Sequence, residues 1–130
     1  MNKIVEELKK TKVFYVATMD QDQPRVRPFA AVTEFEGKPY ICSNNQKACY
    51  EQMMKNPKVE ICGMEEDNTW IRVTGRLVLD ERIEAKTAIL ADPTGPSMLY
   101  KAEDDIFVTF CIEDAVCTKY SFTADPVVIQ

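Results

Sequence analysis

The residues best suited to chemistry begin with a short basic run, Arg25-Val26-Arg27-Pro28. Side chains alternate between the two faces of an extended chain, so both arginines project from the same face. The guanidinium group is planar and always charged, which suits it to phosphate, carboxylate or a flat aromatic ring. The run therefore indicates an anionic, cofactor-like ligand. The alternative is a solvated strand edge with two separate positive charges, because exposed charges are common on strands.

A second polar segment, Ser43-Asn44-Asn45-Gln46-Lys47, follows a strand-like run and precedes a helix-like one. The first N–H groups of a helix lack partners inside the helix, and the helix dipole favours an anion at that end. Together with the Ser43 hydroxyl and the Lys47 ammonium, this segment predicts a phosphate site at a helix start. The alternative is an ordinary capped helix, because Ser43 and Gln46 have the S-x-x-Q spacing of a capping box.

A hairpin connects these two segments. The triplet Glu36-Gly37-Lys38 predicts a tight turn, because glycine supplies the positive φ that such turns need. The strands on either side must then pair antiparallel, which brings residues 25–28 close to Cys42 and Ser43. A phosphate bound by Ser43 and Lys47 would place the rest of its ligand near the two arginines.

The elements that position these residues follow from strand-forming runs, alternation and turn signals. We predict helices over residues 4–10, 48–55 and 81–90, the last capped by Asp80. We predict strands over residues 13–19, 25–35, 39–42, 59–64, 69–79, 105–112 and 115–122, with Glu113-Asp114 turning between the last two. Gly75, within the longest alternating stretch, predicts a bulge or a sharp bend such as a barrel corner. This order favours a single domain, residues 1–130, that is mainly β with peripheral helices and forms an antiparallel closed or split barrel.

Composition limits the chemistry that the chain can perform. Its 130 residues include no histidine, which excludes Ser-His-Asp and Cys-His catalysis, imidazole zinc sites and histidine-ligated haem. The formal net charge of −5 argues against nucleic acid or an anionic membrane as the partner. No apolar run approaches the roughly 20 residues that cross a bilayer, and the N-terminal segment is acidic where a signal peptide is apolar. We therefore expect a cytoplasmic protein.

The cysteines form no C-x-x-C pair. Cys42, Cys62, Cys111 and Cys117 lie in apolar or strand-like runs, so we expect small buried side chains in a reducing compartment. A reactive thiol stays open for Cys42 and Cys49, which flank the polar segment. No side chain stands out as an acid or a base, so no catalytic residue is assigned, and no metal site is predicted.

The order and spacing of several short motifs resemble the flavin mononucleotide (FMN)-binding split barrels related to pyridoxamine 5′-phosphate oxidase, including nitroimidazole-reductase-like members. The similar motifs are Val13-Phe14-Tyr15-Val16-Ala17-Thr18, Gln23-Pro24-Arg25-Val26-Arg27-Pro28-Phe29, Tyr40-Ile41-Cys42-Ser43-Asn44 through Lys47, Asn56-Pro57-Lys58-Val59 and Trp70-Ile71-Arg72-Val73-Thr74-Gly75. The resemblance implies an antiparallel split β-barrel that forms a homodimer, with FMN at the subunit interface.

The same resemblance implies a set of cofactor-binding residues: Arg25, Val26, Arg27, Pro28, Cys42, Ser43, Asn44, Gln46, Lys47 and Trp70. Residues 25–28 would lie against the flavin ring and its pyrimidine edge. Ser43, Asn44 and Lys47 would hold the phosphate, with Gln46 as a secondary contact, and Trp70 would reach the flavin or the partner chain. The C-terminal strands and tail would cover the partner subunit's flavin.

One departure from the family narrows the function. Pyridoxamine phosphate oxidases proper hold the substrate phosphate with basic residues, including histidine, near the C-terminal end, and this chain ends without any histidine. We therefore expect a small flavin-dependent oxidoreductase of unidentified substrate rather than a vitamin B6 oxidase, with the redox step supplied by the flavin. The alternatives are a non-catalytic flavin-binding or electron-transfer module, a deazaflavin-binding relative, and a barrel without cofactor.

Overall fold

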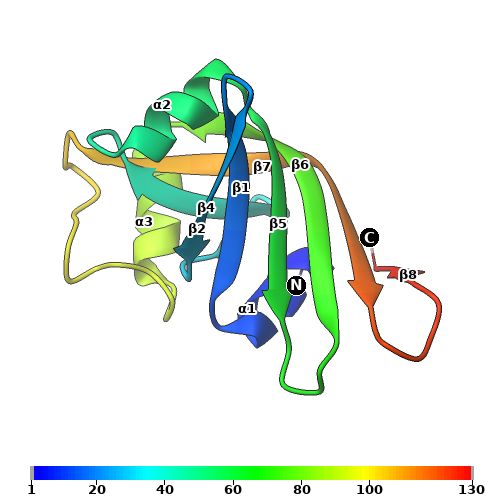
Figure 1. Ribbon diagram of the computed structural model, residues 1–130. Coiled ribbons are helices and arrows are strands. Elements are labelled where there is room, and N and C mark those ends of the chain that lie inside the picture. Colours follow the sequence, from blue (N-terminus) through cyan, green and yellow to red (C-terminus); the bar gives the residue numbers. More distant parts are fainter. Residues whose placement is uncertain (1, 130) are drawn as a thin grey trace.

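The computed structural model describes residues 2–129, which contain eight strands and three helices joined by loops (Figure 1). In chain order they are α1 (Lys3–Thr11), β1 (Phe14–Asp20), β2 (Gln23–Phe29), β3 (Thr33–Phe35), β4 (Lys38–Asn44), α2 (Ala48–Lys55), β5 (Lys58–Met64), β6 (Trp70–Asp80), α3 (Ile83–Ala91), β7 (Phe107–Tyr120) and β8 (Val127–Val128). Within this part of the chain, no helix has the length and apolarity needed to cross a membrane.

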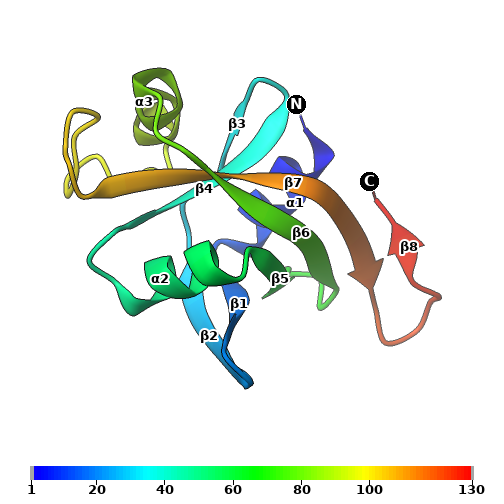
Figure 2. The ribbon, with the colours of Figure 1, turned by 90° about the horizontal axis from the view of Figure 1, so that it is seen from above.

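The strands form one antiparallel sheet in the order β2-β1-β5-β6-β7-β4-β3, and β8 pairs with β7. The sheet curls on itself, with α2 across the upper end in Figure 1 and α1 at the lower end. Seen from above, β4 and β7 run together across the barrel, while β1, β2 and β5 lie on another side (Figure 2). The two edge strands of the sheet, β2 and β3, do not pair with each other in the described residues, so the barrel stays open between them. The predicted antiparallel split barrel is therefore confirmed.

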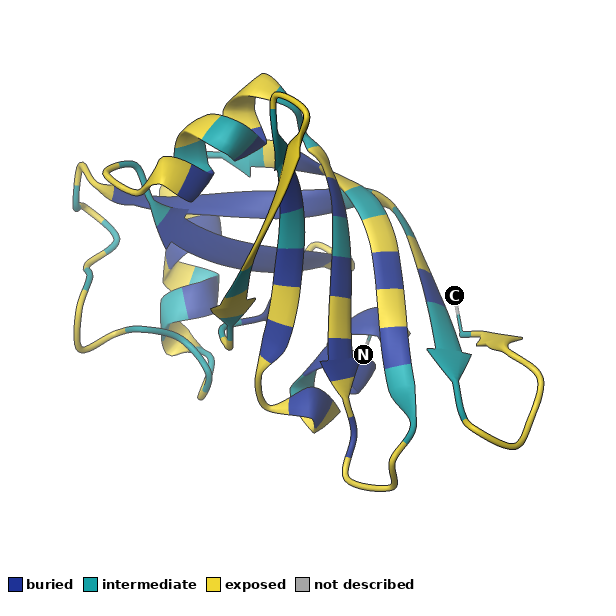
Figure 3. Cartoon of the chain, in the orientation of Figure 1, coloured by how far each residue is buried: buried dark blue, intermediate teal, exposed yellow. Residues whose placement is uncertain are grey.

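Buried and more exposed residues alternate along β5 and β6 (Figure 3), as expected for strands with one face toward the interior of the barrel. Phe14, Ile61, Ile71 and Phe110 are fully buried in one continuous core. Met53 joins this core from α2, so the helix that follows the polar segment is held in place by packing.

The hairpin that the sequence predicted is shorter than expected. Residues 25–35 do not form one strand: β2 ends at Phe29, and of this stretch only β3 pairs with β4. β2 pairs instead with β1, placing Arg27 opposite Val16 and Pro28 opposite Tyr15. The apolar run before β3 thus crosses from one edge of the sheet to the other rather than extending a strand.

The predicted turn at Glu113-Asp114 is also wrong, because β7 is a continuous strand of 14 residues. The register with β6 shifts there: Thr74 pairs with Val116, and Arg76 pairs with Glu113. Two residues of β7 therefore face one residue of β6, which is a β-bulge.

Gly75 is the single β6 residue at this bulge, so the predicted bulge is confirmed. A Cβ at Gly75 would lie 2.6 Å from Ile112 Cγ2, so the close approach of the two strands requires glycine.

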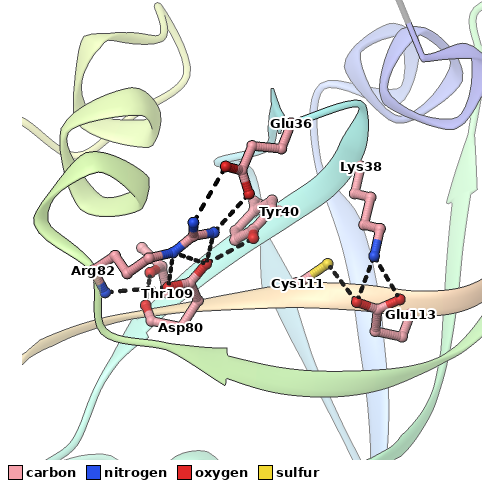
Figure 4. A network of polar contacts seen from close by, with 8 residues as sticks. All are labelled: Glu36, Lys38, Tyr40, Asp80, Arg82, Thr109, Cys111 and Glu113. Carbon is pink, nitrogen blue, oxygen red and sulfur yellow. Dashed lines mark hydrogen bonds and ion pairs between the residues drawn. The ribbon is translucent and has the colours of Figure 1, made fainter.

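Asp80 does not cap α3 as predicted, because the helix begins at Ile83 and its N-cap, Arg82, makes no side-chain cap bond. The Asp80 carboxylate instead accepts hydrogen bonds from the Tyr40 hydroxyl (2.7 Å) and from Arg82 Nη2 (2.8 Å), and Arg82 also pairs with Glu36 (2.7 Å; Figure 4). The Arg82 guanidinium lowers the pKa of Asp80 to about 2. This network ties the β3–β4 turn to the start of α3.

One smaller prediction needs correction, and the tail takes a defined place. Cys62 is exposed on β5, whereas Cys42, Cys111 and Cys117 are buried as expected. The C-terminal tail forms β8, which pairs with Thr118 and Lys119 of the same chain.

Candidate functional site

A hollow of about 250 Å³ lies where the end of β2, the end of β4 and the loop after α3 meet. It is lined by Pro28, Phe29, Ala30, Ala31, Cys42, Ser43, Lys47, Thr94, Pro96, Leu99 and Tyr100. We call it the β4–α2 hollow. Of the residues predicted from sequence, Pro28, Cys42, Ser43 and Lys47 come together here.

The route that brings these residues together differs from the predicted hairpin. After β2 the chain runs through Ala30 and Ala31 to β3, and β3 pairs with β4. Pro28 itself stays in β2, paired with Tyr15 of β1. It therefore shares the hollow with Ser43 without strand pairing between β2 and β4.

Ser43 and Lys47 form the polar end of the β4–α2 hollow. The capping box is wrong: the N-cap of α2 is Lys47, with no side-chain cap bond. Ser43 lies buried on β4, with its Oγ 3.5 Å from Cys49 Sγ. The Ser43 hydroxyl is therefore not used to start the helix. The first N–H groups of α2 lie beside the Lys47 backbone, an arrangement that suits an anion.

Cys42 forms part of the hollow's lining next to Ser43. Burial raises the pKa of its thiol to about 12, although the Lys47 charge acts in the opposite direction. The thiol is therefore neutral at pH 7, and a neutral thiol is a poor nucleophile. Cys42 is an apolar wall of the hollow, and Cys49 is also buried.

The other residues of the polar segment contact the protein itself. Asn44 Nδ2 donates to the Tyr100 hydroxyl (2.5 Å), which connects β4 to the loop after α3. Gln46 is exposed, and its side chain donates to Asn45 Oδ1 (2.8 Å).

The two predicted arginines lie outside the lining of the hollow. Arg27 donates to the Thr18 hydroxyl (2.7 Å), to Gln52 Oε1 (2.5 Å) and to the Val16 carbonyl (3.2 Å). Arg25 is exposed, with its Nε 3.4 Å from Asp20. Val26, between them, is also exposed.

Trp70 starts β6 at the end of the barrel away from α2 (Figure 1). Its ring stacks on Tyr120, with centroids 5.8 Å apart, and contacts Phe122 at 5.0 Å. Arg72 lies over the Tyr120 ring at 4.7 Å. Trp70 and the β4–α2 hollow are therefore separate features of the chain.

The loop between α3 and β7 supplies the wall that the sequence prediction missed. The Thr94 hydroxyl donates to the Val32 carbonyl and accepts from the Val32 N–H, both at 3.0 Å. Asp92 accepts from Lys9 (2.7 Å) and from the Thr33 hydroxyl (2.9 Å). These bonds fix the loop over the hollow. The run of Pro and Gly at residues 93–96 signalled a loop but gave no sign of where it lies.

A larger hollow of about 360 Å³ lies beside α2, lined by Met19, Asp20, Gln21, Ala48, Glu51, Gln52, Lys55 and Asn56. Its two carboxylates, Asp20 and Glu51, outnumber its one ammonium, Lys55. This balance disfavours an anion such as phosphate. The β4–α2 hollow has Lys47 and no carboxylate in its lining, so it suits an anion better.

Comparison with known proteins places the fold in a family. The family model described as pyridoxamine 5′-phosphate oxidase matches residues 1–101. A NimC/NimA family protein from Clostridium acetobutylicum is 44% identical, with a TM-score of 0.90, covering 97% of this chain and 91% of that one. A search of curated proteins found no match.

Two more distant structures share the fold. A pyridoxamine 5′-phosphate oxidase-related, FMN-binding protein from Nostoc punctiforme is 14% identical, with a TM-score of 0.65, covering 93% of this chain and 80% of that one. A heme-binding protein from Mycobacterium smegmatis is 15% identical, with a TM-score of 0.73, covering 98% of this chain and 58% of that one.

Proposed function

Because the chain belongs to the pyridoxamine 5′-phosphate oxidase family, we propose that it is a flavoprotein that binds FMN in the β4–α2 hollow. The observation that carries this proposal is the pairing of a cationic end with an apolar wall. Ser43 lies near the end of β4 and Lys47 is the N-cap of α2, and residues 28–31 form the wall beside them. FMN has the matching chemistry, with a phosphate at one end and a flat ring at the other. A distant structural relative from Nostoc punctiforme is described as FMN-binding.

The polar and the apolar residues of the hollow have different parts in this proposal. The Ser43 hydroxyl and the first N–H groups of α2 donate hydrogen bonds to the phosphate, and Lys47 neutralises its charge. Pro28 and the apolar residues after it give the ring a dry surface. The bound flavin supplies hydride or electron transfer, and the chain binds and orients it. The lining offers no carboxylate, so no acid–base step is assigned to it.

We further propose that the cofactor site is completed in a homodimer. The hollow, at about 250 Å³, is smaller than the roughly 300–1,000 Å³ of typical ligand pockets. Leu99 in its lining is 75% exposed, so the wall is open on that side. A second chain would close it. In such a dimer, Trp70 of one subunit contacts the flavin bound by the other subunit. Within one chain, Trp70 lies away from the β4–α2 hollow and cannot reach the flavin bound there.

The binding test compares FMN with riboflavin, which has the same ring and no phosphate. We expect Lys47→Met to weaken FMN binding by about ten- to 150-fold, because one charge-assisted hydrogen bond is worth roughly 1.5–3 kcal/mol. Riboflavin binding should barely change. Lys12→Met is the matched control, because Lys12 is exposed and its one ion pair in the described part of the chain is with Glu66. Wild-type protein that binds neither flavin would disprove the proposal.

A separate assay tests whether the flavoprotein is a small oxidoreductase. FMN-loaded protein is mixed with reduced nicotinamide and a nitroaromatic or quinone acceptor, and consumption of the nicotinamide is followed. Sustained turnover supports an enzyme. Tight FMN binding without turnover supports the alternative, an electron-transfer module.

A further inference from the structure

A buried ion cluster joins α1 to two strands at the end of the barrel away from α2 (Figure 1). Its members are Glu7 on α1, Glu65 directly after β5, and Lys119 near the end of β7, and we call it the α1 cluster. Glu7 and Glu65 are only 6% and 8% exposed. The Lys119 ammonium lies 2.9 Å from Glu7 Oε1 and 3.5 Å from Glu65 Oε1, so one cation serves two carboxyls.

The packing of α1 on β5 holds the two carboxyls in place. A Cβ at Gly63, two residues before Glu65, would lie 2.8 Å from Thr11 Cγ2, so helix and strand are in direct contact here. Val5 and Leu8, close to Glu7 on the helix, are fully buried. The Glu7 carboxyl therefore cannot turn toward water unless α1 moves.

One oxygen of each carboxyl lacks a hydrogen bond. Within residues 2–129, Glu7 Oε2 and Glu65 Oε2 are buried and have no hydrogen-bond partner. Lys10 Nζ lies 3.4 Å from Glu7 Oε2, but the Lys10 side chain is 58% exposed, so water screens this contact. With both carboxyls ionised, the cluster would bury two negative charges against the single positive charge of Lys119. One proton between the carboxyls would remove the excess charge and supply the missing donor.

The surroundings of the two carboxyls favour opposite protonation states. Burial raises the pKa of Glu65, and the hydrogen bond and charge of Glu7 raise it further. Burial also opposes ionisation of Glu7, but hydrogen bonds from Lys119 and Glu65 lower the pKa of Glu7 overall. Glu65 is therefore the proton donor of the pair, and Glu7 is the acceptor.

We propose that Glu7 and Glu65 share one proton in the folded protein, and that this proton holds α1 against β5 and β7. Loss of the proton leaves two like charges buried close together, and movement of α1 away from the sheet relieves their repulsion. The contact of α1 with the barrel thus depends on pH. The inference is independent of the proposed FMN site, because no member of the α1 cluster lines the β4–α2 hollow.

The other groups around the α1 cluster are of kinds that ordinarily titrate outside pH 5–7.5. They are Lys9, Lys10 and Lys12 on or next to α1, Glu66 and Asp67 in the turn after β5, and Cys117 on β7. Burial raises the pKa of Cys117 to about 11. The strand partners of Lys119 are the apolar Ile71 on β6 and Val127 on β8. Because the chain also has no histidine, a change of stability in this pH range points to the carboxyl pair.

Urea unfolding between pH 5 and 7.5, at a fixed protein concentration, tests the proton. The folded state should bind more protons than the unfolded state, so the unfolding constant of the wild type should rise with pH, by at most about tenfold per pH unit. Glu65→Gln cannot bind the proton, and its profile should be flat. Glu7→Gln removes the neighbouring charge and should shift the rise to lower pH. Glu66→Gln is the matched control, because Glu66 is 81% exposed, and it should follow the wild type.

Three results of this titration would overturn the proposal. A flat wild-type profile would mean that no proton is held, and a rising Glu65→Gln profile would mean that another group holds it. An unchanged profile in Glu7→Gln would mean that burial alone keeps the proton on Glu65 and that it is not shared. If a variant fails to fold, infrared spectroscopy of the folded wild type decides, because the carbonyl band of one protonated carboxyl should persist above the ordinary glutamate pKa of about 4.3. Its absence would also overturn the proposal.

Hydrogen exchange tests the effect on α1. After correction for the intrinsic pH dependence of exchange, the wild-type amides of α1 should open more often at about pH 7.5 than at about pH 5. Glu65→Gln should show no such difference. The amides of α2, which packs at the other end of the barrel, are the internal control. An equal increase in both helices would mean that the whole barrel loosens, and the specific hold on α1 would be wrong.

Discussion

The Asp80 network allows a quantitative prediction for Asp80→Asn, which keeps the shape of the side chain and removes its charge. The pKa of Asp80 falls from 3.8 to about 2, chiefly through the hydrogen bonds from Arg82. A difference of about 2 pKa units corresponds to roughly 2–3 kcal/mol. Because the Arg82 side chain is 49% exposed, solvent screening reduces the expected cost of the variant to about 1–2 kcal/mol at pH 7.

The pH dependence fixes the sign of this effect. The pKa of Asp80 is lower in the folded state than in the unfolded state, so its stabilising contribution is present above pH 4 and is lost as the pH falls toward 2. The assay is urea unfolding at fixed protein concentration between pH 7 and pH 2.5. The difference between wild type and Asp80→Asn should shrink steadily as the pH falls.

The matched control is Asp114→Asn, because Asp114 is exposed and, within residues 2–129, its one ion pair is with Arg76 at 3.4 Å. Its free energy of unfolding should lie within about 0.5 kcal/mol of the wild type. The reasoning is refuted if Asp80→Asn costs no more than this control at pH 7, or if its cost is the same at pH 2.5.

Three further changes test other parts of the fold. Burial raises the pKa of Glu65, and the neighbouring Glu7 raises it further, so the wild type loses stability as the pH rises through that pKa. Glu65→Gln mimics the protonated form and should gain stability over the wild type between pH 5 and 8 in urea unfolding, while the exposed Glu66→Gln should not. Gly75→Ala places a methyl 2.6 Å from Ile112 Cγ2 and should cost about 1–3 kcal/mol by the same assay. An alkylating reagent should modify Cys62 in the folded protein, because the other cysteines are buried, and mass mapping that finds Cys42 or Cys117 modified first would contradict this.

The parts of the fold that could be predicted from the sequence are those determined by residues close together in the chain. Alternation over residues 69–79 predicts β6, and the glycine within it predicts the bulge. Met53 faces the core on a helix whose end is marked by Asn56-Pro57, so α2 also follows from nearby residues. In each case the residues that determine the structure lie within one element.

The errors occur where a distant partner decides the outcome. Residues 25–35 have a continuous strand-like pattern, but the chain leaves the β1 edge at Phe29 to reach the β4 edge. Glu113-Asp114 has the composition of a turn, yet pairing with β6 keeps the strand continuous and absorbs the extra residue as a bulge. Such choices depend on which strands meet across the barrel, which local propensity does not encode.

The residues of the candidate site also divide into those set by nearby sequence and those set by distant partners. Ser43 and Lys47 could be found from the strand-to-helix junction, since both lie within five residues of each other. Thr94 and Tyr100 could not, because they reach the hollow through hydrogen bonds to Val32 and Asn44, each more than fifty residues away along the chain.

The length of β7 has a consequence for synthesis of the protein on the ribosome. β7 pairs with β6 on one side and with β4 on the other, so neither of those strands has this partner until residues 107–120 have been made. At about 5–20 residues per second, translation of these 14 residues takes roughly 1–3 seconds. Until then the nascent chain presents two unpaired strand edges, which are templates for pairing with other chains. Productive folding of this barrel therefore waits for its second-to-last strand.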